Sequence, residues 1–144
     1  MSLKKLKAEN IRHLVVHCAA TPPSSDIGVE AIDRWHRERG WRKVGYHYVI
    51  TRDGLVQFGR CADEMGAHVK GRNDTSIGIC LVGGVDEEGE PEDNYTPNQQ
   101  VSLRALLEAL QYAYPEAEVV GHRDFPEVDK ACPCFDVQEW YTNG

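Results

Sequence analysis

Two histidines and one cysteine are the residues of this chain best placed to do chemistry together. His17 closes the apolar run 13–17 and His122 closes the run 118–122, so each imidazole stands where a predicted strand ends. Cys132 follows ten residues after His122, close enough for a loop to return its thiol to the same edge of a sheet. Two imidazoles and one thiolate form a three-ligand set for a catalytic zinc ion, with a fourth position left for water.

Each of these residues also has an ordinary structural interpretation. A lone histidine at a strand end is more often a satisfied polar residue than a ligand, and an isolated cysteine is often a small buried hydrophobe. The metal hypothesis therefore requires the three side chains to converge. A structural metal is the weaker alternative, because closed structural sites use four protein ligands.

Two further residues are candidates to assist such a metal. Lys130 precedes Cys132 by two positions, and in an extended segment both side chains point to the same side. The ammonium would then stand where a hydrolysed carbonyl develops negative charge, although a solvated surface lysine is the commoner case. Tyr46 could hydrogen-bond the attacking water, but in a strand it would share a face with Tyr48 and Ile50 and could equally be core.

The elements that must position these residues alternate between strands and helices. Runs of apolar, aromatic and β-branched residues predict strands over 14–19, 44–51, 55–58, 76–83 and 118–121. Apolar stripes at helical spacing predict helices over 29–39 and 97–114, and a short terminal helix carries Trp140. We therefore predict an α/β fold, a single domain with a central mixed β-sheet and helices on both faces.

Capping signals mark where two of the helices begin. Thr96 and Gln99 have the spacing of a capping box, with Pro97 at the first helical position. Asp136 and Glu139 have the same spacing before the terminal helix. Asp53-Gly54, between two short apolar runs, predicts a hairpin.

Length and charge limit the classes of protein to consider. The 144 residues fit one domain, with a core expected over about 12–141. The net charge of −7 argues against a nucleic-acid partner, because proteins that bind phosphates are usually basic. No apolar segment follows the basic N-terminal residues, so we expect no signal peptide, no membrane span and a cytoplasmic location. The default oligomeric state is a monomer.

The five cysteines are odd in number and show no Cys-x-x-Cys spacing. Without a secretory signal, reduced thiols are expected. Cys18 and Cys80 lie within apolar runs and are predicted to be small core residues.

Six segments of the chain, in the same order, resemble the zinc N-acetylmuramoyl-L-alanine amidases, which share the fold of peptidoglycan recognition proteins. They are 16–21, 45–50, 52–54, 73–79, 121–124 and 130–133. The resemblance extends over roughly 12–141. The compact size and the lack of a signal are most similar to the phage lysozyme branch, whose members are amidases that act as endolysins.

The resemblance implies a role for each candidate. One Zn²⁺ ion would be bound by His17, His122 and Cys132, Tyr46 would assist the attacking water, and Lys130 would stabilise the oxyanion. The substrate would be peptidoglycan, cleaved at the amide between N-acetylmuramic acid and L-alanine. Zinc would lower the pKa of water from about 15.7 toward about 7, which supplies hydroxide at neutral pH.

The resemblance leaves more than one interpretation for His68 and for Cys134. His68 resembles a position that lines the substrate groove, and an ordinary surface histidine is an equally good interpretation. Cys134 stands where a glycine often follows the proline of the family motif, so its thiol could compete for zinc or pair with another thiol. No role follows for the remaining residues of these types, namely His13, His36, His47 and Cys61.

The sequence is also compatible with two functions other than amide hydrolysis. Proteins of the same fold that lack the cysteine ligand bind peptidoglycan without cutting it, so a binding module is the leading alternative to an enzyme. A second alternative is a dual-role regulator that binds an intracellular phage or host protein. As an enzyme without an export signal, the protein would act on the periplasmic wall only after release.

Overall fold

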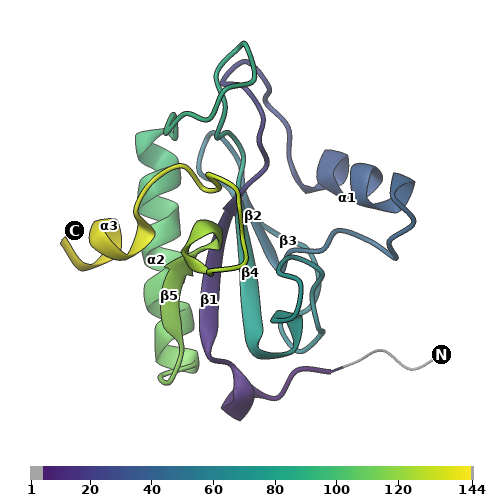
Figure 1. Ribbon diagram of the computed structural model, residues 1–144, viewed down its shortest axis with the longest axis vertical. Helices are drawn as coiled ribbons and strands as arrows, with labels where there is room; N and C mark the ends of the chain where they lie inside the picture. The colour runs from purple at the N-terminus through teal and green to yellow at the C-terminus, as the bar shows by residue number, and fades with distance from the viewer. Residues whose placement is uncertain (1–4, 144) are drawn as a thin grey trace.

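A five-stranded sheet runs through the middle of the molecule in the computed structural model, which describes residues 5–143 (Figure 1). The strands are β1 (His13–Cys18), β2 (Tyr48–Ile50), β3 (Val56–Phe58), β4 (Ser76–Leu81) and β5 (Glu118–Gly121). The α-helices are α1 (Val29–Glu38), α2 (Pro97–Ala113) and α3 (Val137–Asn143). Three short 3-10 helices are η1 (Ala8–Asn10), η2 (Asn73–Thr75) and η3 (His122–Asp124). Residues 1–4 and the last residue of the expected domain lie outside the described range.

The sheet has the strand order β3-β2-β4-β1-β5 and is mixed, as predicted. β2, β4, β1 and β5 are parallel neighbours, whereas β3 is antiparallel to β2. Val16 on β1 lies opposite Gly121 on β5. The residues that follow these two, His17 and His122, therefore come side by side at one end of the sheet.

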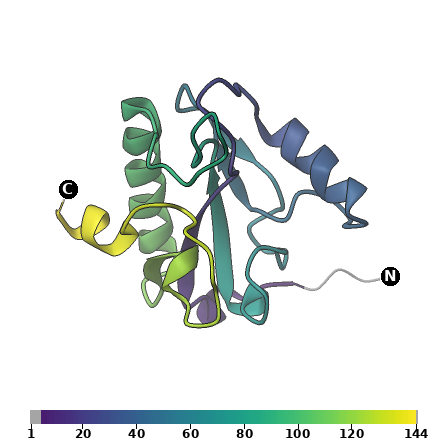
Figure 2. The ribbon, with the colours of Figure 1, turned by 45° about the horizontal axis from the view of Figure 1, so that its top comes forward.

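Helices cover both faces of the sheet, which confirms the predicted architecture (Figure 2). On one face, α2 contributes Leu103 and Leu107 to the larger apolar core. On the other face, α1 contributes Ile32, which packs against Val49 and Cys80. Side chains alternate between the faces along each strand, so consecutive residues of β1 and β4 serve different cores.

Helix α2 begins as its capping box predicts. The Thr96 side chain accepts a hydrogen bond from the Gln99 backbone N–H, and the Gln99 side chain accepts one from the Thr96 N–H at 3.0 Å. Pro97 occupies the first helical position. Two backbone donors that would otherwise be unpaired at the helix start are satisfied by this arrangement.

One predicted strand is shorter than expected, and this changes where Tyr46 points. The strand predicted over 44–51 is regular only over Tyr48–Ile50. Bends at positions 45 and 47 interrupt the alternation before it. Tyr46 therefore packs with the cluster under α1, whereas Ile50 belongs to the core under α2. The expectation that Tyr46, Tyr48 and Ile50 share a face was wrong.

The other strand boundaries differ from prediction by at most two residues. β1 begins and ends one residue earlier than predicted, and β4 ends at Leu81 instead of Gly83. Among the residues that the structure describes, no helix is both long enough and apolar enough to cross a membrane.

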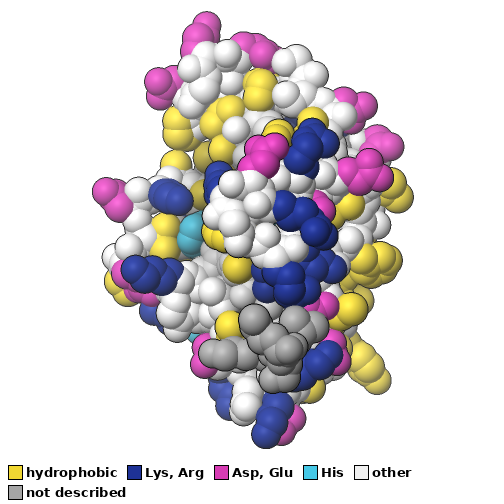
Figure 3. Space-filling view, turned by 90° about the vertical axis from the view of Figure 1, so that its right-hand side faces the viewer, with side chains coloured by type: hydrophobic (Ala, Val, Ile, Leu, Met, Phe, Trp, Pro, Cys, Tyr) yellow, Lys and Arg dark blue, Asp and Glu magenta, His cyan; other side chains and the backbone are white. Residues whose placement is uncertain are grey.

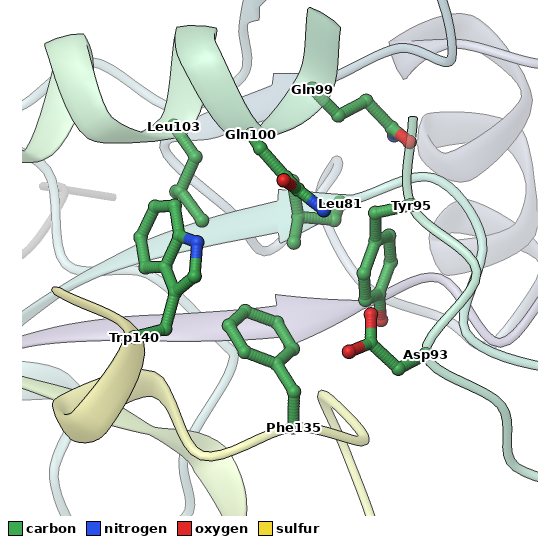
Figure 4. Close-up of a pocket in the computed structure, with 8 residues that line it drawn as sticks. All are labelled: Leu81, Asp93, Tyr95, Gln99, Gln100, Leu103, Phe135 and Trp140. Atoms are coloured by element: carbon green, nitrogen blue, oxygen red, sulfur yellow. The ribbon is translucent and has the colours of Figure 1, made fainter. Parts of the chain in front are cut away.

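A small cavity of about 30 Å³ lies within the core on the α2 side. Figure 4 shows Leu103 and Gln100 reaching into it from α2, with Trp140, Phe135 and Tyr95 around the remaining walls. Its lining residues, all of them within the described part of the chain, include no histidine and no cysteine. The cavity is therefore separate from the candidate metal ligands.

Candidate metal centre and active site

The three predicted metal ligands lie together on the α1 side of the sheet. One potential ligand atom from each of His17, His122 and Cys132 lies within 4.8 Å of the other two. The His17 and His122 rings are 4.4 Å apart between centroids. The pairing of β1 with β5 explains the two histidines, because both rings extend from the same end of neighbouring parallel strands.

Backbone hydrogen bonds bring the third residue of this group to the sheet. The Arg123 N–H donates to the Cys132 carbonyl at 2.8 Å, which ties the loop to the segment after β5. The Cys18 N–H donates to the Cys132 sulfur at 3.1 Å, which ties the same loop to β1. The second bond also places a positive dipole against the sulfur, and this favours a thiolate ligand.

The electrostatic environment keeps both imidazoles neutral. Burial, together with the neighbouring His68, His122 and Lys130, lowers the pKa of His17 well below 6.5. Burial and the Lys130 charge lower the pKa of His122 as well. A neutral imidazole is the form that binds a metal. Without a cation, the hydrogen bond to the Cys18 thiol and burial raise the pKa of the Cys132 thiol, so a bound cation would be needed to hold it as thiolate.

Tyr46 lies beside this group, with its ring centroid 5.1 Å from that of His17. Burial, followed by nearby cysteine sulfurs, raises the pKa of the Tyr46 hydroxyl well above 10. The hydroxyl is therefore protonated at any ordinary pH and can act as a hydrogen-bond donor.

Lys130 also faces the group, but not for the reason that its spacing suggested. The segment 130–134 forms a bend and a turn, closed by a hydrogen bond from the Cys134 N–H to the Ala131 carbonyl at 2.6 Å. The premise of an extended segment was thus wrong. Lys130 nonetheless lines the same hollow as the three candidate ligands.

This hollow has a volume of about 260 Å³ and opens beside a larger groove of about 850 Å³. The two share several lining residues, among them His68, His122 and Lys130. The groove thus gives a large molecule access to the candidate metal centre.

His68 has a different environment from that of a surface histidine. Its Nδ1 lies 2.9 Å from Nε2 of His17, and its Nε2 lies 3.2 Å from the Ser76 hydroxyl. It lines both the hollow and the groove, as a substrate-binding residue would, yet it also contacts a candidate metal ligand directly.

Several residues around the hollow were not predicted from the sequence. Trp35 and Arg39 of the α1 region, and Trp41 after it, line its wall. The apolar stripe over 29–39 predicted a helix, but its spacing does not show that the helix borders the site. Ser76 belongs to the predicted strand 76–83 and to the motif segment 73–79, and no local signal shows that it contacts His68.

The remaining histidines and cysteines lie outside the ligand group. The Nδ1 of His47 accepts from the Gly78 N–H, and its Nε2 donates to the Glu64 carbonyl, so its ring bridges backbone segments. His36 accepts from the Gly45 N–H. The Cys134 thiol donates to the Gly84 carbonyl at 3.2 Å. Cys18 and Cys80 are buried, as predicted.

Comparison with known proteins decides the class of this site. The family model described as N-acetylmuramoyl-L-alanine amidase matches residues 7–135. The chain belongs to the N-acetylmuramoyl-L-alanine amidase family. The endolysin of Enterobacteria phage K11 is 48% identical over 138 residues, covering 96% of this chain and 90% of that protein. This amidase thus has the expected likeness to phage endolysins.

Solved structures agree with this assignment. The N-acetylmuramoyl-L-alanine amidase LysC from Clostridium intestinale URNW is 26% identical, with a TM-score of 0.78 over 99% of this chain and 92% of that chain. Drosophila PGRP-LB, at 23% identity, has a TM-score of 0.76 over 99% of this chain and 83% of that chain, and shares its fold. The amidase is an enzyme of cell-wall lysis, and the expectation of an amide hydrolase is confirmed.

Proposed function

We propose that this amidase hydrolyses the bond between N-acetylmuramic acid and L-alanine with one zinc ion held by His17, His122 and Cys132. The observation that carries the proposal is the convergence of these three donors, from three separate segments, to within 4.8 Å of one another. Residues this far apart in sequence meet only because β1, β5 and the loop after η3 share one edge of the fold.

The chemistry of the donors fits zinc. Two neutral imidazoles and one thiolate are a borderline-soft set, which suits zinc better than magnesium or calcium. Three protein donors leave one coordination position open, as catalytic zinc sites require. The donors line a hollow that is open to the larger groove, so the open position would be accessible to substrate.

The remaining residues of the hollow would complete the reaction. When bound, zinc supplies the Lewis acidity that activates water and polarises the amide carbonyl. The protonated Tyr46 hydroxyl is placed to donate a hydrogen bond to the reacting oxygen, and the Lys130 ammonium to stabilise the negative charge that develops on the carbonyl oxygen. The departing amine takes up a proton, either from Tyr46 or from water.

The charge of the hollow suits a substrate that carries carboxylates, as peptidoglycan stem peptides do, because the charged residues that line it, Arg39 and Lys130, are both basic. Seen from the α1 side, Lys and Arg side chains gather near the middle of the face, although the whole chain has a net charge of −7 (Figure 3). In the groove, Lys70 and Lys130 lie alongside Glu127 and Asp129, so the charges that line it balance. We expect the amidase to act as a monomer, on the wall, after its release from the cell interior.

Metal analysis combined with a wall-digestion assay tests this function. The purified protein should contain about one zinc per chain and release stem peptides from purified peptidoglycan. A chelator should abolish the release, and added zinc should restore it. A protein that binds peptidoglycan but releases no peptide at any zinc concentration would instead be a binding module.

A further inference from the structure

We infer that His68 and Ser76 are positioning residues, which hold His17 in the tautomer that turns the lone pair of its Nδ1 toward the metal. The inference deepens the proposed function and rests on His17 being a ligand. It assigns His68 a task other than contact with substrate, and it gives Ser76 a role of its own.

A chain of hydrogen bonds links Ser76 through His68 to His17. The Ser76 hydroxyl has a single proton, and it donates this proton to the Arg72 carbonyl at 2.7 Å. Toward His68 the hydroxyl oxygen can therefore only accept, across 3.2 Å. Nε2 of His68 must then carry a proton, and Nδ1 of the neutral ring is left as an acceptor.

The acceptor nitrogen of His68 in turn determines where the proton of His17 lies. Nδ1 of His68 lies 2.9 Å from Nε2 of His17, so the proton of this bond belongs to His17. A neutral His17 with its proton on Nε2 has its lone pair on Nδ1, which is the nitrogen left for a metal. The opposite orientation would place an N–H on the metal side and prevent coordination.

Packing holds the His68 ring in the position that this chain requires. A Cβ at position 78 would come within 2.6 Å of the His68 ring, so the ring lies directly against the backbone of Gly78. The Asn73 side chain accepts from the N–H groups of His68 and Val69, at 2.8 and 2.9 Å. These contacts fix both the ring and the backbone of His68. The chain of hydrogen bonds also starts from a fixed group, the Arg72 backbone carbonyl near the start of β4.

Outer hydrogen-bond partners of metal-bound histidines typically contribute about 10- to 100-fold to metal affinity. We therefore expect His68→Phe, which keeps a ring but no ring nitrogen, to weaken zinc binding by about this factor. His68→Asn should keep most of the affinity, because its amide oxygen can accept where Nδ1 did. Ser76→Ala should give an intermediate loss, and His13→Phe, at the other end of β1, should give none.

Two measurements without substrate test the inference. Long-range proton–nitrogen NMR of the ¹⁵N-labelled, metal-free protein should show both His17 and His68 protonated on Nε2. Competition with a chromophoric chelator should give the predicted order of zinc affinities. Thermal unfolding of each metal-free variant identifies any that do not fold, and His68→Asn and Ser76→Ala remain informative if His68→Phe is one of them.

A proton on Nδ1 of either ring would overturn the inference, as would wild-type zinc affinity in folded His68→Phe or Ser76→Ala protein. A substrate-binding role alone for His68 would leave zinc affinity unchanged in every variant. If the wild-type protein has the predicted tautomers but takes up no zinc, the proposed function fails while the proton chain stands.

Discussion

At the scale of single residues, the site combines groups whose surroundings fix their protonation states. Burial lowers the pKa of both candidate histidine ligands and raises that of the Tyr46 hydroxyl. The imidazoles are thus ready to bind a cation, and the tyrosine is ready to donate a hydrogen bond. Cys132 is the one group that depends on the metal to reach its working form.

Cys132→Ser should remove zinc and activity together. A serine hydroxyl stays protonated where the thiol would ionise, so the ligand set falls to two imidazoles. Zinc content and stem-peptide release measure the two effects, with Cys61→Ser, an exposed cysteine, as the control. Full turnover in a metal-free Cys132→Ser protein would contradict the proposed mechanism.

Tyr46→Phe and Lys130→Ala should each retain zinc but slow hydrolysis. Loss of one preorganised donor to a developing oxyanion costs about 100- to 1,000-fold in kcat. Initial rates of stem-peptide release, normalised to zinc content, check this expectation. Lys7→Ala removes an exposed lysine remote from the hollow and should leave the rate unchanged. Unchanged rates in both active-site variants would exclude these residues from the mechanism.

At the scale of elements, the two faces of the sheet carry separate tasks. The α1 face holds the candidate ligands, the hollow and the groove, whereas the α2 face holds the larger apolar core. The strands connect the two, because alternate residues of β1 supply core side chains on one face and His17 on the other. Stability and metal binding should therefore be separable by mutation.

Thr96→Ala tests this separation. It removes the capping bond of α2 and the bond that the Thr96 hydroxyl donates to the Arg52 carbonyl at 2.6 Å. Loss of such a cap lowers the free energy of unfolding by about 1 to 2 kcal/mol. Denaturant unfolding should show this loss, and Thr96→Ser should recover most of it. Zinc affinity should stay at the wild-type value; a parallel loss would show that the two faces are coupled.

At the scale of the whole molecule, buried histidines make stability depend on pH. Burial, followed by the charges of Arg39 and Arg60, lowers the pKa of His36 to about 4, and burial lowers the pKa of His47. Both rings would titrate near pH 6.5 in the unfolded chain but take up their protons only at lower pH in the fold. The unfolded state therefore binds more protons below pH 6.5, and acid favours unfolding.

The metal-free protein should accordingly lose stability as the pH falls from 6.5 to about 4.5. Carboxylates titrate mainly below this pH window. Burial by itself would raise the pKa of Glu64, but hydrogen bonds from Arg42 and Cys61 outweigh it and lower that pKa from 4.5 to about 2. Urea unfolding of chelator-treated protein at several pH values measures the effect. A free energy of unfolding that is constant or rises toward pH 4.5 would rule out the neutral, buried state of these histidines.

Short-range patterns in the sequence were enough to predict the local elements, and the family motifs could be read in order. The apolar run of β4 and the capping box of α2 are short-range patterns, and both elements begin where these patterns predicted. The β5 strand has the predicted limits, Glu118–Gly121. Such features are readable because propensity and capping depend on residues only a few positions apart.

How distant segments meet depends on contacts that form only in the folded molecule. Bends before β2 turned Tyr46 to the α1 face, against the alternation expected of a strand. A turn, rather than an extended segment, brought Lys130 and Cys132 to the hollow. The link from Ser76 through His68 to His17 joins residues up to 59 positions apart, and no periodicity records such contacts, because they arise from strand pairing and loop packing through space.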